Sequence, residues 1–299
     1  MLKLFDYVLL FGILLAFAAN SILNRLALKT SALVDEIAID PASFTAIRLV
    51  SGAVFLTVFL YFSGKRLSRP QALHWRGAVF LFMYAIAFSY AYISLDAAMG
   101  ALILFGVVQI CILSIAIFRG RKLNILEWLG CSIAIIGLLV LTLPHILSIQ
   151  DSGTDVDQIG SSLPIILMVF AGIAWGLFTV NGAASKDSLL DTATCFVLSV
   201  PMIVLVALVV IAKQSIILSA YGAFLAMLSG VFASGMGYAL WYRILPKLAP
   251  SQAASAQLLV PVIAALGGFV FLGELLNFNF IIASALTLGG VLLVIKAAK

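Results

Sequence analysis

The chain has 299 residues, of which 64% are hydrophobic and only 10% are charged, and its mean hydropathy is +1.22. Because a soluble protein carries about 25% charged residues, this composition excludes a water-soluble globule and indicates a protein embedded in lipid. The net charge of +5 does not indicate a nucleic-acid partner, because the basic residues lie between the apolar segments and form no cluster.

Ten apolar runs follow one another along the chain, each close to the roughly 20 residues that a helix needs to cross the hydrocarbon core of a bilayer. Their expected bounds are 7–28, 42–63, 74–94, 97–118, 125–143, 163–184, 192–212, 217–242, 250–272 and 277–296. The first run is too long to be the apolar part of a cleavable signal peptide, and none of the runs alternates as a barrel strand does. The predicted fold class is therefore all-α, an integral membrane bundle of ten transmembrane helices.

The basic residues predict which way up this bundle lies, because loops on the cytoplasmic side of a membrane carry an excess of Lys and Arg. With a cytoplasmic N-terminus, 13 of the 17 Lys and Arg residues fall on the cytoplasmic side. The longest polar connection, residues 148–162, is acidic and falls on the opposite side. We therefore expect a multi-pass protein of the inner (cell) membrane with both termini in the cytoplasm.

One phrase occurs twice in the chain, and its two copies predict an inverted repeat. The first copy, RGRKLNILEWLGCSIAIIGLLVL, begins at Arg119, and the second, LGELLNFNFIIASALTLGGVLLV, begins 153 positions later at Leu272. Five runs precede the acidic connection and five follow it, so the second set must enter the membrane the other way up. The predicted organisation is one transporter domain with a first five-helix repeat at 1–147, an acidic extracytoplasmic linker at 148–162 and a second repeat at 163–299. Such repeats are typical of secondary transporters, which bind substrate near mid-membrane where the halves meet.

The second half also carries the residues of a family resemblance. Residues 230–276 combine small residues and aromatics in the eighth run, an Ala/Ser-rich entry to the ninth, Leu-x-x-Pro at Leu258–Pro261 and then Gly273-Glu274. With Ala-Trp-Gly at 174–176 and Arg48 early in the second run, the chain resembles the EamA-type transporters of the drug/metabolite transporter (DMT) superfamily.

The resemblance implies an alternating-access carrier with a central cavity enclosed by the first four helices of each repeat and with the fifth helix of each at the periphery. Members of the family handle amino acids, other small metabolites and drugs, so the resemblance implies a small-molecule substrate without naming it. In the first half of this chain, the positions that match the proline and the Gly-Glu pair hold Gln109 and Gly120-Arg121.

Polar residues inside the apolar runs are the first candidates for a substrate site. Arg48 is the deepest charge, and an ionisable side chain inside a membrane is costly and therefore a functional candidate, although a purely structural arginine is the alternative. Arg25 lies one turn from the outer end of the first run, where snorkelling to the interface explains it well. The amides Asn20, Asn24 and Asn181 are either donors to a substrate or hydrogen bonds between helices.

Deep aromatic residues form the second set of candidates. Tyr and Trp at the ends of runs are typical of the membrane interface, but Tyr84, Trp175 and Tyr238 lie deeper, where their polar groups need partners. The complete candidate set for substrate binding is Arg48, Asn20, Asn24, Tyr84, Gln109, Trp175, Asn181 and Tyr238. Pro261, Gly235 and Gly237 are candidates for a hinge or gate, with close helix packing as the alternative for the glycines.

Some classes of function are disfavoured because the apolar runs lack the residues that those functions need. No Asp or Glu lies at mid-depth, and a proton-driven exporter of cationic drugs usually needs a buried carboxylate. An enzyme is not expected, because no nucleophile with a base and no metal-ligand cluster is present at depth, and the three cysteines lie inside apolar runs where core packing explains them. A channel is disfavoured by the repeat and by the lack of charged rings.

The expected function is therefore alternating-access export or exchange of a small zwitterionic or anionic metabolite such as an amino acid. A drug/metabolite exporter of broader specificity stays open as an alternative, and a lipid flippase is less favoured. The expected partners are the small-molecule substrate and the lipid bilayer, without nucleic acid, metal or cofactor. The oligomeric state stays open, with a monomer slightly favoured.

Overall fold

A computed structural model describes residues 4–28, 37–67, 69–147, 155–182, 187–212, 216–244, 247–248 and 256–297. The described part is helical, and its one pairing of β type is an isolated bridge between Ile39 and Leu218. In the first repeat the helices are α1 (Leu4–Leu28), α2 (Pro41–Phe62), α3 (Ala72–Ala91), α4 (Ala97–Phe118) and α5 (Ile125–Leu147). In the second they are α6 (Asp155–Gly182), α7 (Ser188–Ala212), α8 (Ala220–Leu228), the π-helix η2 (Ser229–Met236), α9 (Gly237–Ile244), α11 (Leu259–Leu272) and α12 (Phe278–Ala297).

The predicted membrane bundle is confirmed, with differences in the second repeat. Nine helices of the described chain are long and apolar enough to cross a membrane, counting α8, η2 and α9 as one, and α11 is a shorter apolar helix. The helix α6 begins at Asp155, inside the segment predicted to be a linker, whose residues 148–154 lie outside the described part. The eighth span contains a π segment that the apolar pattern did not predict.

The repeated phrase encodes the turn between the last two helices of each repeat. Gly120 follows α4 with φ +93° and Gly273 follows α11 with φ +65°, a left-handed conformation in which only glycine avoids a steric penalty. Asn124 then accepts a hydrogen bond from the backbone of Glu127 at 2.9 Å, as Asn277 does from Phe280 at 2.7 Å. Each copy is thus a helix stop followed by an asparagine that caps the next helix.

The pair formed by α5 and α12 shows that the repeat is inverted. A Cβ atom built on Gly130 would lie 2.7 Å from the carbonyl oxygen of Gly290, and one built on Gly137 would lie 2.9 Å from that of Ala283, so the two helices run antiparallel. The offset of 153 positions in the sequence converts Gly130 into Ala283 and Gly137 into Gly290. One contact therefore becomes the other when the repeats are exchanged, as expected for a two-fold relation.

Close packing at Gly137 leads to a stability prediction. Small residues let transmembrane helices approach closely, and a Cβ on Gly137 would lie 2.6 Å from the backbone nitrogen of Thr287, an atom that cannot yield as the end of a flexible side chain can. We expect Gly137→Val to destabilise the fold by about 1–3 kcal/mol and to lower the melting temperature in detergent. Gly289→Val is the matched control, because nothing lies within 4 Å of a Cβ at that position. Equal melting temperatures for the two variants would contradict this packing.

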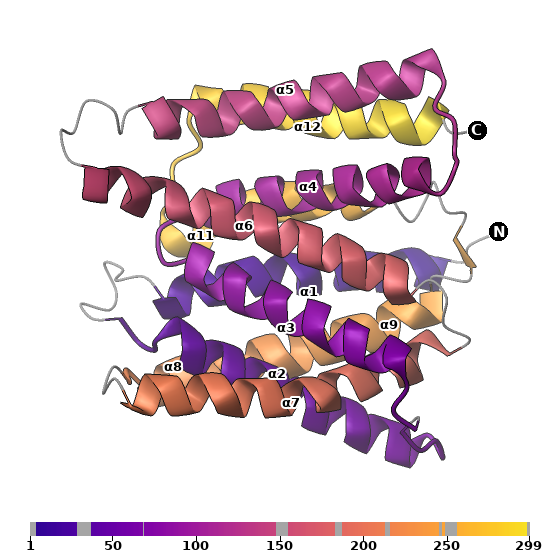
Figure 1. The fold of residues 1–299 in the computed structure, drawn as a ribbon, viewed down its shortest axis with the longest axis vertical. Helices are drawn as coiled ribbons and strands as arrows, with labels where there is room; N and C mark the ends of the chain where they lie inside the picture. Colours follow the sequence, from indigo (N-terminus) through magenta and orange to yellow (C-terminus); the bar gives the residue numbers. More distant parts are fainter. Residues whose placement is uncertain are drawn as a thin grey trace.

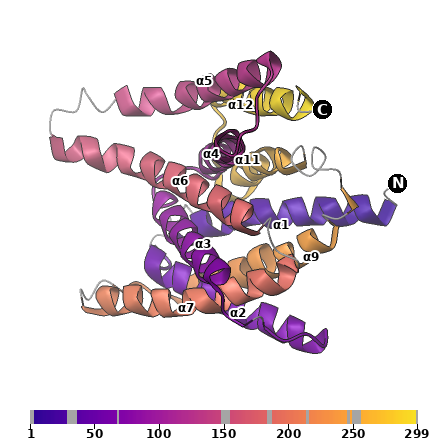
Figure 2. The ribbon, with the colours of Figure 1, turned by 45° about the vertical axis from the view of Figure 1, so that its right-hand side comes forward.

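The other helices pair in the same two-fold manner. The helix α2 packs against α7 and α4 against α11, while the contacts of α3 with α6 and α7 are matched by those of α8–η2–α9 with α1 and α2. Figures 1 and 2 show α5 and α12 together at one edge of the bundle and α2 and α7 near the opposite edge. Both ends of the described chain lie at the same end of the bundle (Figure 1), here termed the terminal face, and the other end is termed the distal face.

Candidate functional site

A cavity of about 180 Å³ lies between the two repeats. Its lining comes from α1, α3 and α4 of the first repeat, from α6, α7, η2 and α9 of the second, and from the segment before α11, and none of the described lining residues belongs to α5 or α12. The lining residues are Phe17, Asn20, Ser21, Tyr84, Phe88, Leu104, Phe105, Trp175, Phe178, Thr179, Gly182, Ser188, Ala233, Tyr238, Trp241 and Gln257.

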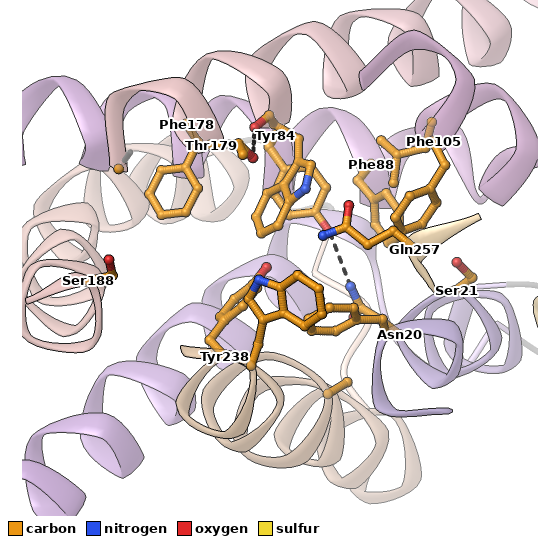
Figure 3. Close-up of a pocket in the computed structure, with 16 residues that line it drawn as sticks. Asn20, Ser21, Tyr84, Phe88, Phe105, Phe178, Thr179, Ser188, Tyr238 and Gln257 are labelled. Atoms are coloured by element: carbon orange, nitrogen blue, oxygen red, sulfur yellow. Dashed lines mark hydrogen bonds between the residues drawn. The ribbon is translucent and has the colours of Figure 1, made fainter. Parts of the chain in front are cut away.

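The cavity extends toward the terminal face. Ser21 and Ser188 mark its two ends in Figure 3. Ser188 is the first residue of α7 and Gly182 is the last of α6, and both of these helix ends belong to the terminal face. Ser21, by contrast, lies within α1 on the way to the distal face, and the rest of α1 beyond it carries the buried residue Arg25.

An aromatic stack forms the middle of the cavity wall. Trp175 of α6 stacks on Tyr238 of α9, with ring centroids 5.3 Å apart and ring planes 25° apart, and packs against the tilted ring of Tyr84 of α3, with ring centroids 4.7 Å apart and ring planes 48° apart. Phe178 lies one turn along α6, with its ring centroid 5.4 Å from that of Trp175. The stack joins both repeats and offers flat apolar faces to a ligand.

Behind this wall runs a buried chain of hydrogen bonds that crosses from one repeat to the other. Ser229 donates to the amide oxygen of Asn20 at 2.6 Å, and the amide nitrogen of Asn20 donates to the Tyr84 hydroxyl at 3.2 Å (Figure 3). Arg48 Nη2 donates to the same hydroxyl at 3.0 Å, and Arg48 Nε donates to Ser234 at 3.2 Å. The Tyr84 oxygen thus accepts two hydrogen bonds, which leaves its own hydrogen for an acceptor in the cavity.

Arg48 is buried, and no charge partner for it is found among the described residues. Its side chain is 1% exposed, and its guanidinium carbon lies 5.2 Å and 5.3 Å from the ring centroids of Tyr84 and Phe88. In the described part of the chain no carboxylate pairs with it, and Nη1 has no hydrogen-bond partner. Arg48 does not itself line the cavity, because the two aromatic rings that do so stand in front of it.

The sequence of this chain is similar to those of known proteins. A family model described as the EamA-like transporter family matches residues 162–296. A protein of Pseudomonas aeruginosa, "Uncharacterized protein PA1977", is 43% identical over 282 residues, which are 94% of this chain and 91% of that protein. The chain belongs to the EamA-like transporter family. It is therefore a multi-pass membrane transporter of the DMT superfamily, and membership of this family points away from an enzyme.

A more distant relative and a solved structure are also similar to this chain. "Uncharacterized transporter YoaV" of Bacillus subtilis (strain 168) is 22% identical over 262 residues, which are 85% of this chain and 86% of that protein. A crystal structure with 19% sequence identity aligns with a TM-score of 0.61 and covers 95% of this chain and 97% of its own. At that identity the crystal structure shows the shared fold alone.

The predicted site residues of this EamA-like transporter fall into two groups. Asn20, Tyr84, Trp175 and Tyr238 line the cavity together, and Arg48 supports Tyr84 from behind. Their binding of a substrate stays a prediction.

The remaining predicted binding residues lie away from the lining. Asn24 is fully buried and donates to the Asn20 carbonyl oxygen at 2.9 Å, so it braces α1. Asn181 donates to the Leu73 carbonyl oxygen at 3.0 Å and lines a separate pocket of only about 10 Å³. Gln109 lies half-buried on α4, outside both of these pockets.

The predicted hinge residues lie at element boundaries. Pro261 is the third residue of α11, so its missing N–H falls among those that have no partner within a helix. Gly235 lies in η2 and Gly237 begins α9, and both face aromatic rings, with Cβ positions 2.7 Å from Phe55 and 3.2 Å from Phe17. The absence of a side chain at both glycines permits these contacts. Segments of π-helix often mark functional sites, but a hinge role for either glycine stays a prediction.

At the terminal face, polar contacts join the two repeats beside the cavity mouth. Lys65 pairs with Asp187, and its hydrogen bond lowers the pKa of the Asp187 carboxyl. His74 Nε2 lies 3.0 Å from Asp191 Oδ1 and is buried between α3 and α7. These contacts hold α2, α3 and α7 together without crossing the cavity.

At the distal face, the side chain of Arg25 does not snorkel as expected, so that prediction was wrong. Its side chain is buried and its Nε lies 3.3 Å from Glu274 Oε1, while Nη2 lies 3.1 Å from Asp96 Oδ1. Nη1 donates to the carbonyl oxygens of Tyr92 and Ile93 at 3.0 Å and 2.8 Å. The side chain points inward because two carboxylates from helix connections meet it there.

Several polar residues of the site were not among the predicted residues. Ser229, Ser234 and Ser89 supply hydroxyls to Asn20, Arg48 and Asn24, and Gln257 lines the cavity. Single serines are common in transmembrane helices, and only the shared face of Ser234 and Tyr238 carried a signal.

Proposed function

We propose that the protein is an alternating-access exporter or exchanger of a small zwitterionic or anionic metabolite such as an amino acid. The observation that carries this proposal is the buried guanidinium of Arg48, which lacks a charge partner among the described residues and keeps Nη1 unpaired. A buried charge without a partner is costly. A ligand carboxylate bound at the Tyr84 hydroxyl would supply the missing negative charge beside Arg48.

The size and walls of the cavity support a small ligand with an apolar part. Its volume of about 180 Å³ is below the roughly 300–1,000 Å³ of pockets that take drug-sized molecules. A lipid or a bulky drug would have to expand it, whereas an amino acid has a suitable size. The stack of Tyr84, Trp175 and Tyr238 would cover an apolar side chain.

Alternating access is supported by the arrangement of the two repeats. The cavity lies where they meet, extends toward the terminal face, and is packed closed toward the distal face. Exchange of the roles of two inverted repeats would produce the opposite state.

The test is counterflow in proteoliposomes loaded with an unlabelled amino-acid mixture. We expect labelled L-leucine or L-phenylalanine to accumulate against an empty-liposome control, and L-phenylalaninamide, which lacks the carboxylate, to compete poorly. Competition by the amide equal to that by the acid would remove the role of the carboxylate. Movement of a fluorescent lipid without amino-acid counterflow would instead identify a flippase.

We further propose that the terminal face is cytoplasmic, in an inner membrane, because Lys and Arg are concentrated on it. Reporter fusions at Asp155 and at Lys299 are expected to report opposite compartments, with Lys299 inside. Reporters in the same compartment would contradict the inverted topology.

A further inference from the structure

The ion cluster of Arg25, Asp96 and Glu274 lies between the cavity and the distal face. Arg25 is one helical turn beyond Ser21, the residue at the distal end of the cavity lining. Arg25 and Asp96 belong to the first repeat and Glu274 to the second, so the cluster ties the repeats together. Glu274 Oε2 also accepts a hydrogen bond from the backbone of Ala97 at 2.8 Å, which fixes the start of α4.

We propose that Arg25, Asp96 and Glu274 form the distal gate of the transporter, which holds the cavity closed on that side while it is open to the terminal face. This inference rests on the proposed alternating-access function. It gives the three residues a gating role that does not require contact with the substrate.

The charges of the cluster suit a gate that must be able to open as well as close. The pair of Arg25 and Glu274 is buried, whereas the side chain of Asp96 is 51% exposed. A buried ion pair gains attraction but loses the hydration of both charges, so its net contribution to stability is small. Burial, followed by the charge of Asp96, raises the pKa of the Glu274 carboxyl in spite of Arg25. The ionised carboxylate is therefore held in an unfavourable environment, and opening to water would hydrate both partners of the pair.

The described residues at the terminal face hold no equivalent of this cluster. The alignment of Asn24 with Asn181 places Gly182 at the position that matches Arg25, and Gly182 lines the mouth of the cavity. The 153-residue offset of the repeated phrase makes Arg121 the residue of the first repeat that is equivalent to Glu274. Arg121 pairs with Glu127 of the same repeat. The packed distal side of the cavity and the terminal side toward which it extends thus correspond to a difference between the repeats in sequence.

The gate is tested by the accessibility of two engineered cysteines in right-side-out and inside-out membrane vesicles. Ser21→Cys reports the distal end of the cavity, and Ser188→Cys reports the terminal mouth, in a background with the native Cys111, Cys131 and Cys195 replaced by alanine. The probe is a membrane-impermeant methanethiosulfonate reagent, applied without substrate.

Neutralising the gate should move the protein toward the state that is open to the distal face. We expect Glu274→Gln to raise the labelling rate of Ser21→Cys from the distal side at least tenfold and to lower that of Ser188→Cys from the terminal side. Simple loss of structure would raise both rates. Glu127→Gln is the matched control, because this buried carboxylate also pairs with an arginine but lies at the terminal face, away from the cavity.

A second variant displaces the carboxylate without removing its charge. A Cβ on Gly268 would lie 2.5 Å from Glu274 Oε2, so Gly268→Ala should push the carboxylate away and change both labelling rates in the same directions. Unchanged rates in both variants would overturn the gate, and rates that rise together on both sides would do so too. Amino-acid counterflow with unchanged labelling would overturn only the gate, whereas changed labelling without counterflow of any tested amino acid would overturn only the proposed substrate class.

Discussion

Replacing Trp175 by alanine should weaken the binding of an apolar amino acid by about tenfold to a hundredfold while the protein stays folded. Trp175 stacks on Tyr238 and packs against the tilted ring of Tyr84, so its removal takes an aromatic ring out of the cavity wall and loosens the two tyrosines that remain. An aromatic pair contributes about 0.5–1.5 kcal/mol beyond burial of its area, and each 1.4 kcal/mol corresponds to about tenfold in affinity. The measurement is the concentration dependence of counterflow in proteoliposomes.

Two further tryptophan variants separate binding from stability. Trp175→Phe keeps a flat ring in the stack and should retain most of the affinity. Trp128→Ala removes a tryptophan that is 56% exposed on α5, far from the cavity lining, and should leave the affinity unchanged. An unchanged affinity in a well-folded Trp175→Ala protein would show that the stack is only structural.

Local chemistry explains why much of the fold is predictable from the sequence. The length of an apolar run and the glycine and asparagine that end and begin helices are local features, so the predicted span 97–118 coincides with α4. The π segment η2 depends instead on tertiary packing. A Cβ on Gly230 would lie 2.2 Å from the carbonyl oxygen of Arg48, so this part of the eighth span is pressed against α2. The hydropathy pattern of the eighth span does not predict that contact.

The residues of the site were predictable from their depth in the membrane, but their hydrogen-bond partners were not. Intramembrane position alone selected Arg48, Tyr84, Trp175 and Tyr238, and the structure brings these residues together. The hydrogen bond from Arg48 to Ser234 spans 186 positions in the sequence, so it depends on how the repeats pack.

For Arg25 the prediction from sequence was wrong, again because its partners lie far away in the sequence. Its distance from the helix end predicted an interfacial side chain, but Asp96 and Glu274 lie in connections whose places are fixed only by the assembled bundle. A basic residue near a helix end can therefore be read as a snorkelling residue only where no carboxylate of another connection reaches it.

Arg48→Ala should abolish amino-acid transport, and Arg48→Lys should fold normally yet bind the amino acid weakly. A lysine keeps the charge but presents a single ammonium group, which cannot reproduce the hydrogen bonds of the planar guanidinium to Ser234 and Tyr84. A hydrogen bond to a charged group contributes about 1.5–3 kcal/mol, so we expect the apparent affinity of the lysine variant to fall by about tenfold to a hundredfold.

The comparison of acid and amide ligands decides whether Arg48 acts on the carboxylate. In the unmodified protein L-phenylalanine should compete far better than L-phenylalaninamide, and this preference should be clearly smaller in Arg48→Lys while the melting temperature in detergent stays close to normal. If Arg48 only braces α2 against Tyr84 and Ser234, both variants should instead melt early, and the protein that survives should keep the preference for the acid. A well-folded Arg48→Ala protein with normal affinity for the acid would remove Arg48 from the site, and with it the reason for expecting an anionic group on the substrate.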